Sequence, residues 1–343
     1  MATQYRFSFG PWNIHEGADP FGPPIRPTRD FVSKLDLAVK LGFQGIQFHD
    51  DDVIPADMPA DQMERGVAEV KKLLDDRGLI AEFIAPRMWE DPRTPDGPVT
   101  SNRKEERQYA IDRSKRAVDI ARMIGTKDIV WWPAREGTYI REAKPARDSF
   151  QYMLEYANTL LEYDKTIRIL GEMKPNEPMD LMYLPTTGHF LALCYKTVDP
   201  SRSGVLIESA HAILAGLDPS DEMAYALWHN KLWSVHLNDQ NGLKYDQDKT
   251  FGSVDLRRAF NQVRVLEAAN YGANGEWVGL DVKAMRTQPF EVAYRHLENS
   301  KEIFLQLVEV NRKVDPQEVQ GLIDARDYEA LELLIVKHLM GLR

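Results

Sequence analysis

The stretch Gly204–His211 reads Gly-Val-Leu-Ile-Glu-Ser-Ala-His, and its pattern is the clearest indication of the fold class. An apolar run about as long as one strand ends in an acid, Glu208, and a histidine follows three residues later. A run that is apolar throughout predicts a strand buried on both faces, as in a parallel sheet. The polar residues that follow it then lie at one edge of that sheet.

Runs of this kind recur along the chain, and amphipathic stretches separate them. The eight predicted strands are Arg6–Trp12, Gly45–His49, Ile80–Ala85, Asp128–Trp132, Ile167–Glu172, Gly204–Glu208, Leu232–Leu237 and Trp277–Val282. The predicted helices are Asp30–Leu41, Asp61–Asp76, Glu105–Ile124, Asp148–Tyr163, Thr187–Val198, Ser220–His229, Asp255–Ala268 and Phe290–Val310.

Strict alternation of strands and helices predicts an α/β protein built from right-handed βαβ units. Eight such units favour a closed (β/α)8 barrel, the TIM barrel, over an open doubly wound sheet. No GxGxxG or P-loop motif follows a predicted strand, which disfavours the nucleotide-binding alternative.

The last part of the chain is predicted to be a short helical tail. Its apolar positions include Leu331, Leu334 and Leu339. We expect one catalytic domain over residues 1–312 and a tail over residues 313–343 that packs on the barrel or on a partner chain. The loop Asp19–Pro27, rich in proline and glycine, is the one long early loop.

Composition narrows the function classes. The formal charge of −10 argues against binding to nucleic acid or to an anionic membrane, either of which needs a basic surface. The single cysteine, Cys194, leaves no partner for an internal disulfide and favours a reducing compartment. The N-terminus lacks the apolar core of a secretory signal, so we expect a cytoplasmic protein.

Acids and histidines collect where the predicted strands end. In a TIM barrel, catalytic residues lie at the carboxyl ends of the strands. Unpaired carboxylates at one mouth would repel one another, and cations resolve that conflict. Oxygen ligands with some imidazole suit Mg²⁺, Mn²⁺ or Co²⁺, and Glu208 could bridge two ions. The strand ends and following loops carry His49, Asp50, Asp51, Asp52, Glu136, Glu172, Lys174, Glu208, His211, His236, Asp246, Asp248 and Asp281.

Each residue alone also has a structural interpretation. His49 could be a satisfied polar residue, and Asp50–Asp52 could cap a helix. Trp132 could be a core residue, and Lys174 a surface ion-pair partner. The joint occurrence of acids or histidines at five of the eight strand ends favours a functional site.

Five separated segments resemble the xylose isomerase family, and together they are specific. The segments are Phe48–Asp52, Trp132–Gly137, Lys174–Pro178, Lys244–Asp248 and Asp281–Thr287.

The resemblance implies a role for each matching residue. His49, oriented by Asp52, would assist opening of the sugar ring, and Lys174 would donate to the substrate carbonyl oxygen. Two divalent ions per subunit, Mn²⁺, Co²⁺ or Mg²⁺, are implied. The first would be held by Glu172, Glu208, His236 and Asp281, and the second by Glu208, His211, Asp246 and Asp248. Trp132 would wall the site, and Phe21 would reach a neighbouring subunit's site. We also expect Trp12 and Trp89 to contact the substrate.

The sequence also departs from the family pattern. His236 stands where the family has an aspartate, which removes one negative charge and favours nitrogen-tolerant ions. Alanines flank His211 where the family has a glycine and a glutamate. Ala85–Arg87 replaces a small polar run that faces the far end of the sugar, so the substrate need not be xylose. The family's long C-terminal arm is mostly missing.

Three functional hypotheses follow. The first is an aldose–ketose isomerase that works by ring opening and a metal-assisted 1,2-hydride shift. The second is an epimerase or lyase that acts on a modified sugar with the same barrel and metals. The third is a binding protein without catalysis, which the pair His49 and Asp52 disfavours because binding alone does not need ring opening. We expect a small sugar as substrate, and a homodimer or homotetramer.

Overall fold

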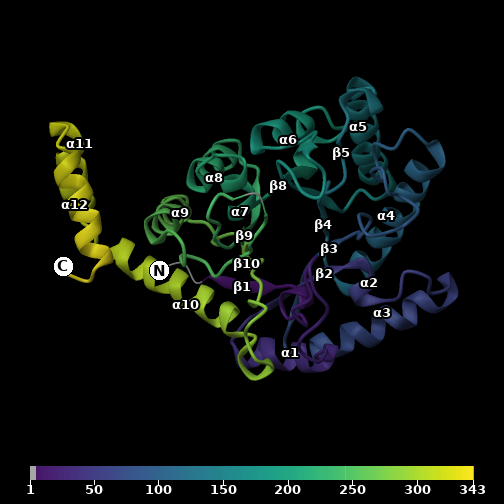
Figure 1. Ribbon diagram of the computed structural model, residues 1–343, viewed down its shortest axis with the longest axis horizontal. Coiled ribbons are helices and arrows are strands. Elements are labelled where there is room, and N and C mark those ends of the chain that lie inside the picture. The colour runs from purple at the N-terminus through teal and green to yellow at the C-terminus, as the bar shows by residue number, and fades with distance from the viewer. Residues whose placement is uncertain (1–4, 244, 343) are drawn as a thin grey trace.

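The computed structural model describes residues 5–243 and 245–342, so Lys244 of the fourth family-like segment lies outside the described residues. Eight parallel strands close into a barrel in the order β1-β10-β9-β8-β6-β4-β3-β2 (Figure 1). The predicted TIM barrel is therefore confirmed. The barrel strands are β1 (Arg6–Phe9), β2 (Gly45–His49), β3 (Ile80–Ala85), β4 (Asp128–Trp131), β6 (Arg168–Glu172), β8 (Ser203–Glu208), β9 (Leu232–Leu237) and β10 (Trp277–Leu280).

The strand bounds differ from the predicted ones by a few residues. The largest difference is at β1, which ends at Phe9 because Pro11 has no N–H to continue the ladder. Pro11–Asn13 instead forms the 3₁₀ helix η1, which carries Trp12 towards the barrel mouth. Trp132 lies just past the end of β4.

The predicted helices surround the barrel, and their bounds agree with the sequence within a few residues at most ends. Local signals set these ends: the side chain of Asp30 accepts from the Ser33 N–H at the start of α1, and Gly125 adopts a left-handed conformation after α4. The helices are α1 (Phe31–Lys40), α3 (Ala60–Asp75), α4 (Lys104–Ile124), α5 (Ala146–Tyr163), α6 (Thr187–Cys194), α8 (Pro219–Trp228), α9 (Leu256–Ala268) and α10 (Arg295–Lys313).

Several short elements were not predicted. Two one-turn helices directly follow barrel strands: α2 (Asp50–Val53) after β2 and α7 (Ser209–Leu214) after β8. A small antiparallel pair, β5 (Gly137–Thr138) with β7 (Leu181–Met182), joins two loops on the carboxyl side of the strands. The remaining 3₁₀ turns are η2 (Arg141–Ala143), η3 (Pro200–Arg202) and η4 (Phe290–Val292), and η4 occupies the predicted start of the last barrel helix.

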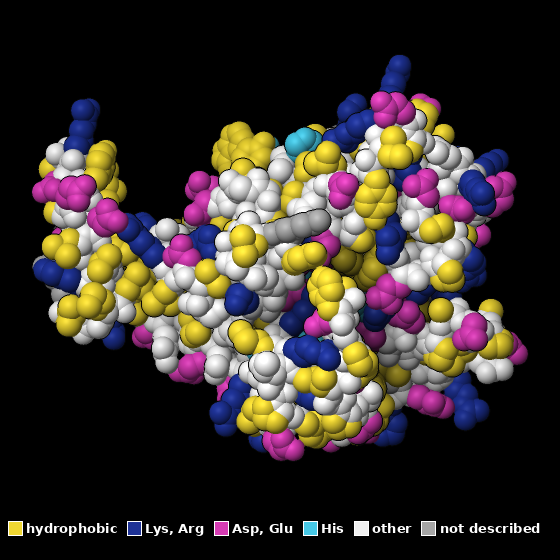
Figure 2. Space-filling model, viewed as in Figure 1, with side chains coloured by type: hydrophobic (Ala, Val, Ile, Leu, Met, Phe, Trp, Pro, Cys, Tyr) yellow, Lys and Arg dark blue, Asp and Glu magenta, His cyan; other side chains and the backbone are white. Residues whose placement is uncertain are grey.

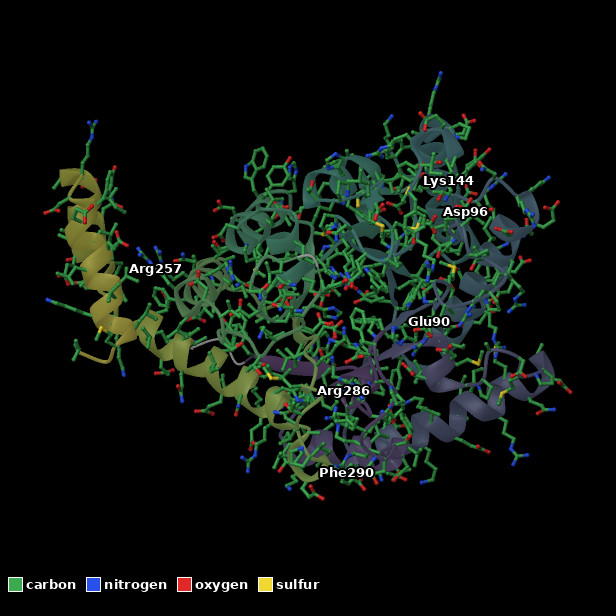
Figure 3. All side chains as sticks on the ribbon, viewed as in Figure 1. Glu90, Asp96, Lys144, Arg257, Arg286 and Phe290 are labelled. Carbon is green, nitrogen blue, oxygen red and sulfur yellow. The ribbon has the colours of Figure 1, made fainter. Side chains whose placement is uncertain are left out.

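The tail is helical and consists of two helices, α11 (Pro316–Ala325) and α12 (Tyr328–Leu339). They project from the barrel as an arm beyond α10 (Figure 1). The arm contacts its own chain through α12 and α10. Arg257 of α9, which Figure 3 labels, also pairs with Glu332 of α12. The predicted domain division at residue 312 stays a prediction, and α10 runs through it to Lys313.

Within residues 5–243 and 245–342, no helix is both long enough and apolar enough to cross a membrane.

Candidate metal centre and active site

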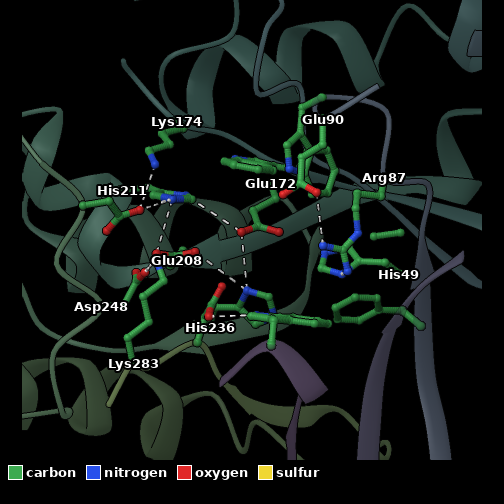
Figure 4. A pocket seen from close by; sticks show the side chains of 17 residues that line it. His49, Arg87, Glu90, Glu172, Lys174, Glu208, His211, His236, Asp248 and Lys283 are labelled. Atoms are coloured by element: carbon green, nitrogen blue, oxygen red, sulfur yellow. Dashed lines mark hydrogen bonds and ion pairs between the residues drawn. The ribbon is translucent and has the colours of Figure 1, made fainter. Parts of the chain in front are cut away.

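A cavity of about 210 Å³ opens at the carboxyl ends of the barrel strands (Figure 4). This is below the usual range of about 300–1,000 Å³ for pockets that hold drug-sized ligands, so it suits a small molecule. Its lining is Trp12, His49, Phe83, Ala85, Arg87, Trp89, Glu90, Trp132, Glu172, Lys174, Glu208, His211, His236, Asp246, Asp248, Asp281 and Lys283.

Four of the predicted metal ligands converge on one point of this cavity. Glu172, Glu208, His236 and Asp281 each offer a ligand atom, and these atoms all lie within 4.8 Å of one another. They come from the ends of β6, β8 and β9 and from the residue that follows β10. Parallel pairing sets this convergence, because Glu208 and His236 are direct partners in the register of β8 and β9.

His236 is built for a ligand that the protein itself does not supply. Its Nδ1 lies 3.4 Å from Glu172 Oε1 and 3.8 Å from Glu208 Oε2, and both ring nitrogens are buried without a hydrogen-bond partner among the described residues. Such orphaned nitrogens are rare unless a metal or water satisfies them. Gly279 faces His236 on β10, and a Cβ there would crowd the imidazole. We call these four residues the first ligand set.

Neighbouring N–H donors orient the carboxylates of Glu208 and Asp281 in the first ligand set. Asn238 donates to Glu208 Oε1 over 2.8 Å, and its own Oδ1 accepts from the Ala210 N–H. Asp281 Oδ1 accepts from Asn13 Nδ2 over 2.7 Å and from Trp12 Nε1 over 3.0 Å. Groups that fix the ligands in this way also tune the affinity for the metal.

The electrostatics of the first ligand set show why a cation fits it. Burial raises the pKa of Glu208 to about 7, because a buried carboxylate among other acids is costly to charge. Burial would also raise the pKa of Glu172, but a positive charge on His236 outweighs burial and lowers that pKa to about 2. The same attraction raises the pKa of His236 well above its usual value despite burial. Without a metal, a proton on His236 supplies the positive charge that the carboxylates require.

A second set of possible ligands shares Glu208 with the first. Glu208, His211 and Asp246 offer atoms within 4.8 Å of one another, and His211 Nε2 lies 3.0 Å from Asp246 Oδ2. Asp248 lies outside this set and pairs with Lys283 instead, so its role as a ligand stays a prediction.

Lys174 lies beside the second set. Its Nζ donates to Asp246 Oδ2 over 2.9 Å and to Glu177 Oε2 over 3.0 Å. Burial would lower the pKa of Lys174, but these two carboxylates raise it, so the ammonium stays charged. The ammonium also lies 5.4 Å from the centre of the Trp132 ring. A fixed positive charge therefore lies on the cavity wall next to the metal ligands (Figure 4).

The predicted pair of His49 and Asp52 is brought together on the other side of the cavity. Asp52 Oδ2 accepts from the His49 backbone N–H over 2.9 Å and lies 3.1 Å from His49 Nδ1. Figure 4 shows His49 and Arg87 across the cavity from Lys174 and His211. His49 Nδ1 is also 2.7 Å from Nη2 of Arg87, a contact that sequence reasoning missed.

Three of the four predicted aromatic residues line the cavity, and Phe21 does not. The ring of Trp12 lies 4.2 Å from that of His49, and the rings of Trp89 and Trp132 form an edge contact at 4.5 Å. Phe21 is 83% exposed, and its ring makes an edge contact with Tyr245 at 6.4 Å. Within its own chain, Phe21 therefore lies outside the cavity.

Sequence reasoning assigned no role to Asn238, Glu177, Lys283 or Arg87, although all four take part in the site. Their positions gave a partial signal, since each follows a barrel strand by one to five residues. Nothing in the linear sequence indicated which carboxylate each one would contact.

Comparison with known proteins gives a family match over most of the chain. A family model described as "Xylose isomerase-like TIM barrel" matches residues 35–292.

Solved structures with the same fold cover nearly the whole chain at low sequence identity. A D-tagatose 3-epimerase-like protein is 15% identical with a TM-score of 0.64, covering 90% of this chain and 98% of its own. The 3-keto-D-glucoside 4-epimerase YcjR from E. coli is 15% identical with a TM-score of 0.62, covering 87% of this chain and 100% of its own. The IOLI protein with a bound zinc atom is 13% identical with a TM-score of 0.61, covering 90% of this chain and 100% of its own. At these identities the likeness shows the fold.

Proposed function

The chain belongs to the xylose isomerase-like TIM barrel family, and on that premise we propose that it is a divalent-metal-dependent enzyme that isomerises a small sugar. The observation that carries the proposal is the convergence of Glu172, Glu208, His236 and Asp281 at the mouth of the barrel. A cation held there would supply Lewis-acid polarisation of neighbouring sugar oxygens.

The chain's own residues supply the other requirements of an aldose–ketose interconversion. Lys174 holds a charged ammonium at the cavity wall, where it can donate to a substrate oxygen as negative charge develops there. Trp12, Trp89 and Trp132 wall the cavity and limit the entry of water. The cavity volume suits one sugar unit rather than a chain of them.

We also propose that the two ligand sets bind their metal ions with different affinities. We expect the first ligand set to bind its ion tightly, because its histidine nitrogens have no other partner among the described residues. We expect the second set to bind more weakly, because Lys174 already neutralises Asp246. Imidazole in the first set favours Mn²⁺ or Co²⁺ relative to Mg²⁺.

A second candidate reaction is epimerisation at a carbon next to a carbonyl. Ring opening requires His49 to act as a base, and the contact of Arg87 with His49 Nδ1 opposes that role. The contact therefore favours epimerisation over ring opening. Similar folds among solved structures include a D-tagatose 3-epimerase-like protein and a 3-keto-D-glucoside 4-epimerase.

Product analysis in deuterated water tests the proposal and separates its two forms. The chelator-stripped protein is incubated with a panel of aldoses and ketoses and with Mg²⁺, Mn²⁺ or Co²⁺. A hydride shift keeps the substrate hydrogen, so isomerised product without carbon-bound deuterium supports the first form. An epimer that carries deuterium supports the second. No conversion of any sugar with any of these ions contradicts the proposal.

We also propose that the protein assembles as a homodimer or homotetramer. The support is an 83% exposed Phe21 on the loop that resembles the family's intersubunit segment. Hydrophobic side chains are also exposed on the protruding arm, including Tyr328, Leu333 and Met340 (Figure 2).

A further inference from the structure

The guanidinium of Arg87 is fixed against the imidazole of His49. Its Nη2 lies 2.7 Å from His49 Nδ1 and 3.1 Å from Asp52 Oδ1, and its Nε donates to Asp51 Oδ1 over 2.9 Å. The backbone N–H of Arg87 donates to Asp50 Oδ1 over 2.7 Å. Arg87 is therefore held at both its backbone and its side chain by the short helix α2.

A second arginine fixes the acids that hold Arg87. Arg113 of α4 is buried and donates to Asp50 Oδ2 over 2.9 Å and to Asp51 Oδ2 over 3.2 Å. The carboxylates of α2 are thus aligned from both sides, so the position of Arg87 is determined by a network rather than by one flexible contact.

The chemistry of the two groups decides which nitrogen of His49 carries hydrogen. A guanidinium has only donors and stays protonated, so a contact of 2.7 Å requires a lone pair on His49 Nδ1. The carboxylate of Asp52, 3.1 Å from the same nitrogen, can only accept and would require an N–H there. One nitrogen cannot meet both requirements.

The competition favours Arg87. Its contact with Nδ1 is the shorter of the two, and the carboxylate of Asp52 has other donors. Asp52 Oδ2 accepts from the His49 backbone N–H, and Asp52 Oδ1 accepts from Arg87. Asp52 is therefore satisfied without the imidazole hydrogen, whereas an N–H on Nδ1 would point at the donors of Arg87.

We infer that Arg87 is a positioning residue that keeps the ring hydrogen of His49 on Nε2, so that His49 offers a hydrogen-bond donor to the substrate. The ring lines the cavity between Trp12 at 4.2 Å and Trp89 at 5.2 Å. This packing fixes the plane of the imidazole ring, and Arg87, in contact with Nδ1, determines the tautomer.

The tautomer narrows the class of substrate, a step that rests on the proposed function. Removal of a proton from a sugar hydroxyl requires a lone pair on Nε2, which this tautomer does not have. A donor at that place instead suits an oxygen that carries no hydrogen and can only accept, such as a carbonyl or carboxylate oxygen. The site therefore favours a sugar that enters with its carbonyl already free, such as an open-chain ketose or a keto-sugar, over a closed ring that His49 must open.

The tautomer is measured by ¹⁵N NMR on the Mg²⁺-loaded protein with ¹⁵N-labelled histidine, because protonated and unprotonated ring nitrogens have well-separated shifts. His49→Gln identifies the resonances. In the wild type we expect hydrogen on Nε2 and none on Nδ1. In Arg87→Met we expect the hydrogen to move to Nδ1, opposite Asp52. Arg87→Lys, whose ammonium also only donates, is the matched control and keeps the hydrogen on Nε2.

A wild-type spectrum with hydrogen on Nδ1 overturns the inference, and this outcome needs no variant to fold. An unchanged spectrum in a folded Arg87→Met protein also overturns it. Turnover of a sugar panel, measured in parallel, separates this inference from the proposed function. The predicted tautomer with no sugar turned over contradicts the function alone, and sugar turnover with hydrogen on Nδ1 contradicts the inference alone.

Discussion

Glu208 and His236 are direct partners in the pairing of β8 with β9, and Glu208 Oε2 lies 3.8 Å from His236 Nδ1 at the barrel mouth. Because side chains on paired residues of neighbouring strands project from the same level of the sheet, the two groups point at one place. Burial raises the pKa of Glu208 to about 7, and the surrounding carboxylates raise the pKa of His236. The buried negative charge around this pair therefore requires a positive charge at the first ligand set.

Replacement of Lys174 tests its role beside the metal ligands. We expect Lys174→Met to lower kcat/KM by about 10²-fold or more, the scale for deleting a preorganised donor to developing charge. Lys71→Met, which removes an exposed partner of Asp75, is the control and should leave kcat/KM unchanged. Circular dichroism should show the same fold in both variants. If kcat/KM of Lys174→Met equals the wild-type value, Lys174 has a structural role only.

Gly171 in β6 tests the packing beneath the site. A Cβ at this position would overlap the ring of Phe190, which is buried behind the strand. We expect Gly171→Ala to lower the free energy of unfolding by about 1–3 kcal/mol, the usual cost of overpacking. Gly188→Ala is the matched control, because its Cβ would meet only Tyr225 at 3.8 Å. Equal stability of the two variants in urea unfolding would refute the packing account.

The buried His296 should make the protein less stable towards unfolding at acidic pH. Burial lowers its pKa to about 4, and its ring Nε2 bonds the backbone oxygen of Asn13. In the unfolded chain the pKa of His296 is near 6.5, so its imidazole is protonated as the pH falls below that value. In the folded protein the imidazole is not protonated until about pH 4. The free energy of unfolding therefore decreases as the pH falls from 6.5 to 4.

The contribution of His296 is read from the slope of stability against pH. We expect His296→Gln to reduce that slope between pH 6.5 and pH 4 by up to about 1.4 kcal/mol per pH unit. Chemical unfolding at several pH values measures it. Parallel curves for wild type and His296→Gln would show that His296 is charged in the folded state.

The exposed aromatic and apolar residues predict self-association. We expect sedimentation to give a dimer or a larger species at micromolar concentration, because isolated exposed patches on Phe21 and the arm would be covered by another copy. Phe21→Ser should weaken that association, whereas Tyr139→Ser, which changes another exposed aromatic residue, should not. A strictly monomeric, fully active wild type would rule the assembly out.

The sequence predicted the barrel well because buried parallel strands have an unmistakable composition. The runs ending at Glu172, Glu208 and Leu237 gave strands within one residue of their observed bounds. The one-turn helices α2 and α7 were missed because four to six residues are too few to show a helical period.

The contacts between residues of the site were harder to predict from the sequence than the residues themselves. His236 and Glu208 were expected together because the family resemblance implies that both hold the first metal. The contacts of Lys283 with Asp248 and of Arg87 with His49 join residues 35 and 38 positions apart, from loops whose paths the sequence does not determine. Such contacts depend on tertiary packing, and only a structure reveals them.

Calorimetric titration of the chelator-stripped protein with Mn²⁺ tests whether Glu172, Glu208, His236 and Asp281 hold a divalent metal. The wild type should bind Mn²⁺, and His236→Ala should bind it at least about 10- to 100-fold more weakly. His236→Asp should retain binding but shift preference towards Mg²⁺, because it exchanges a nitrogen ligand for an oxygen ligand. His189→Ala, at an exposed position outside the cavity, should bind as the wild type does. Identical Mn²⁺ affinity in the wild type, His236→Ala and His236→Asp would contradict the account.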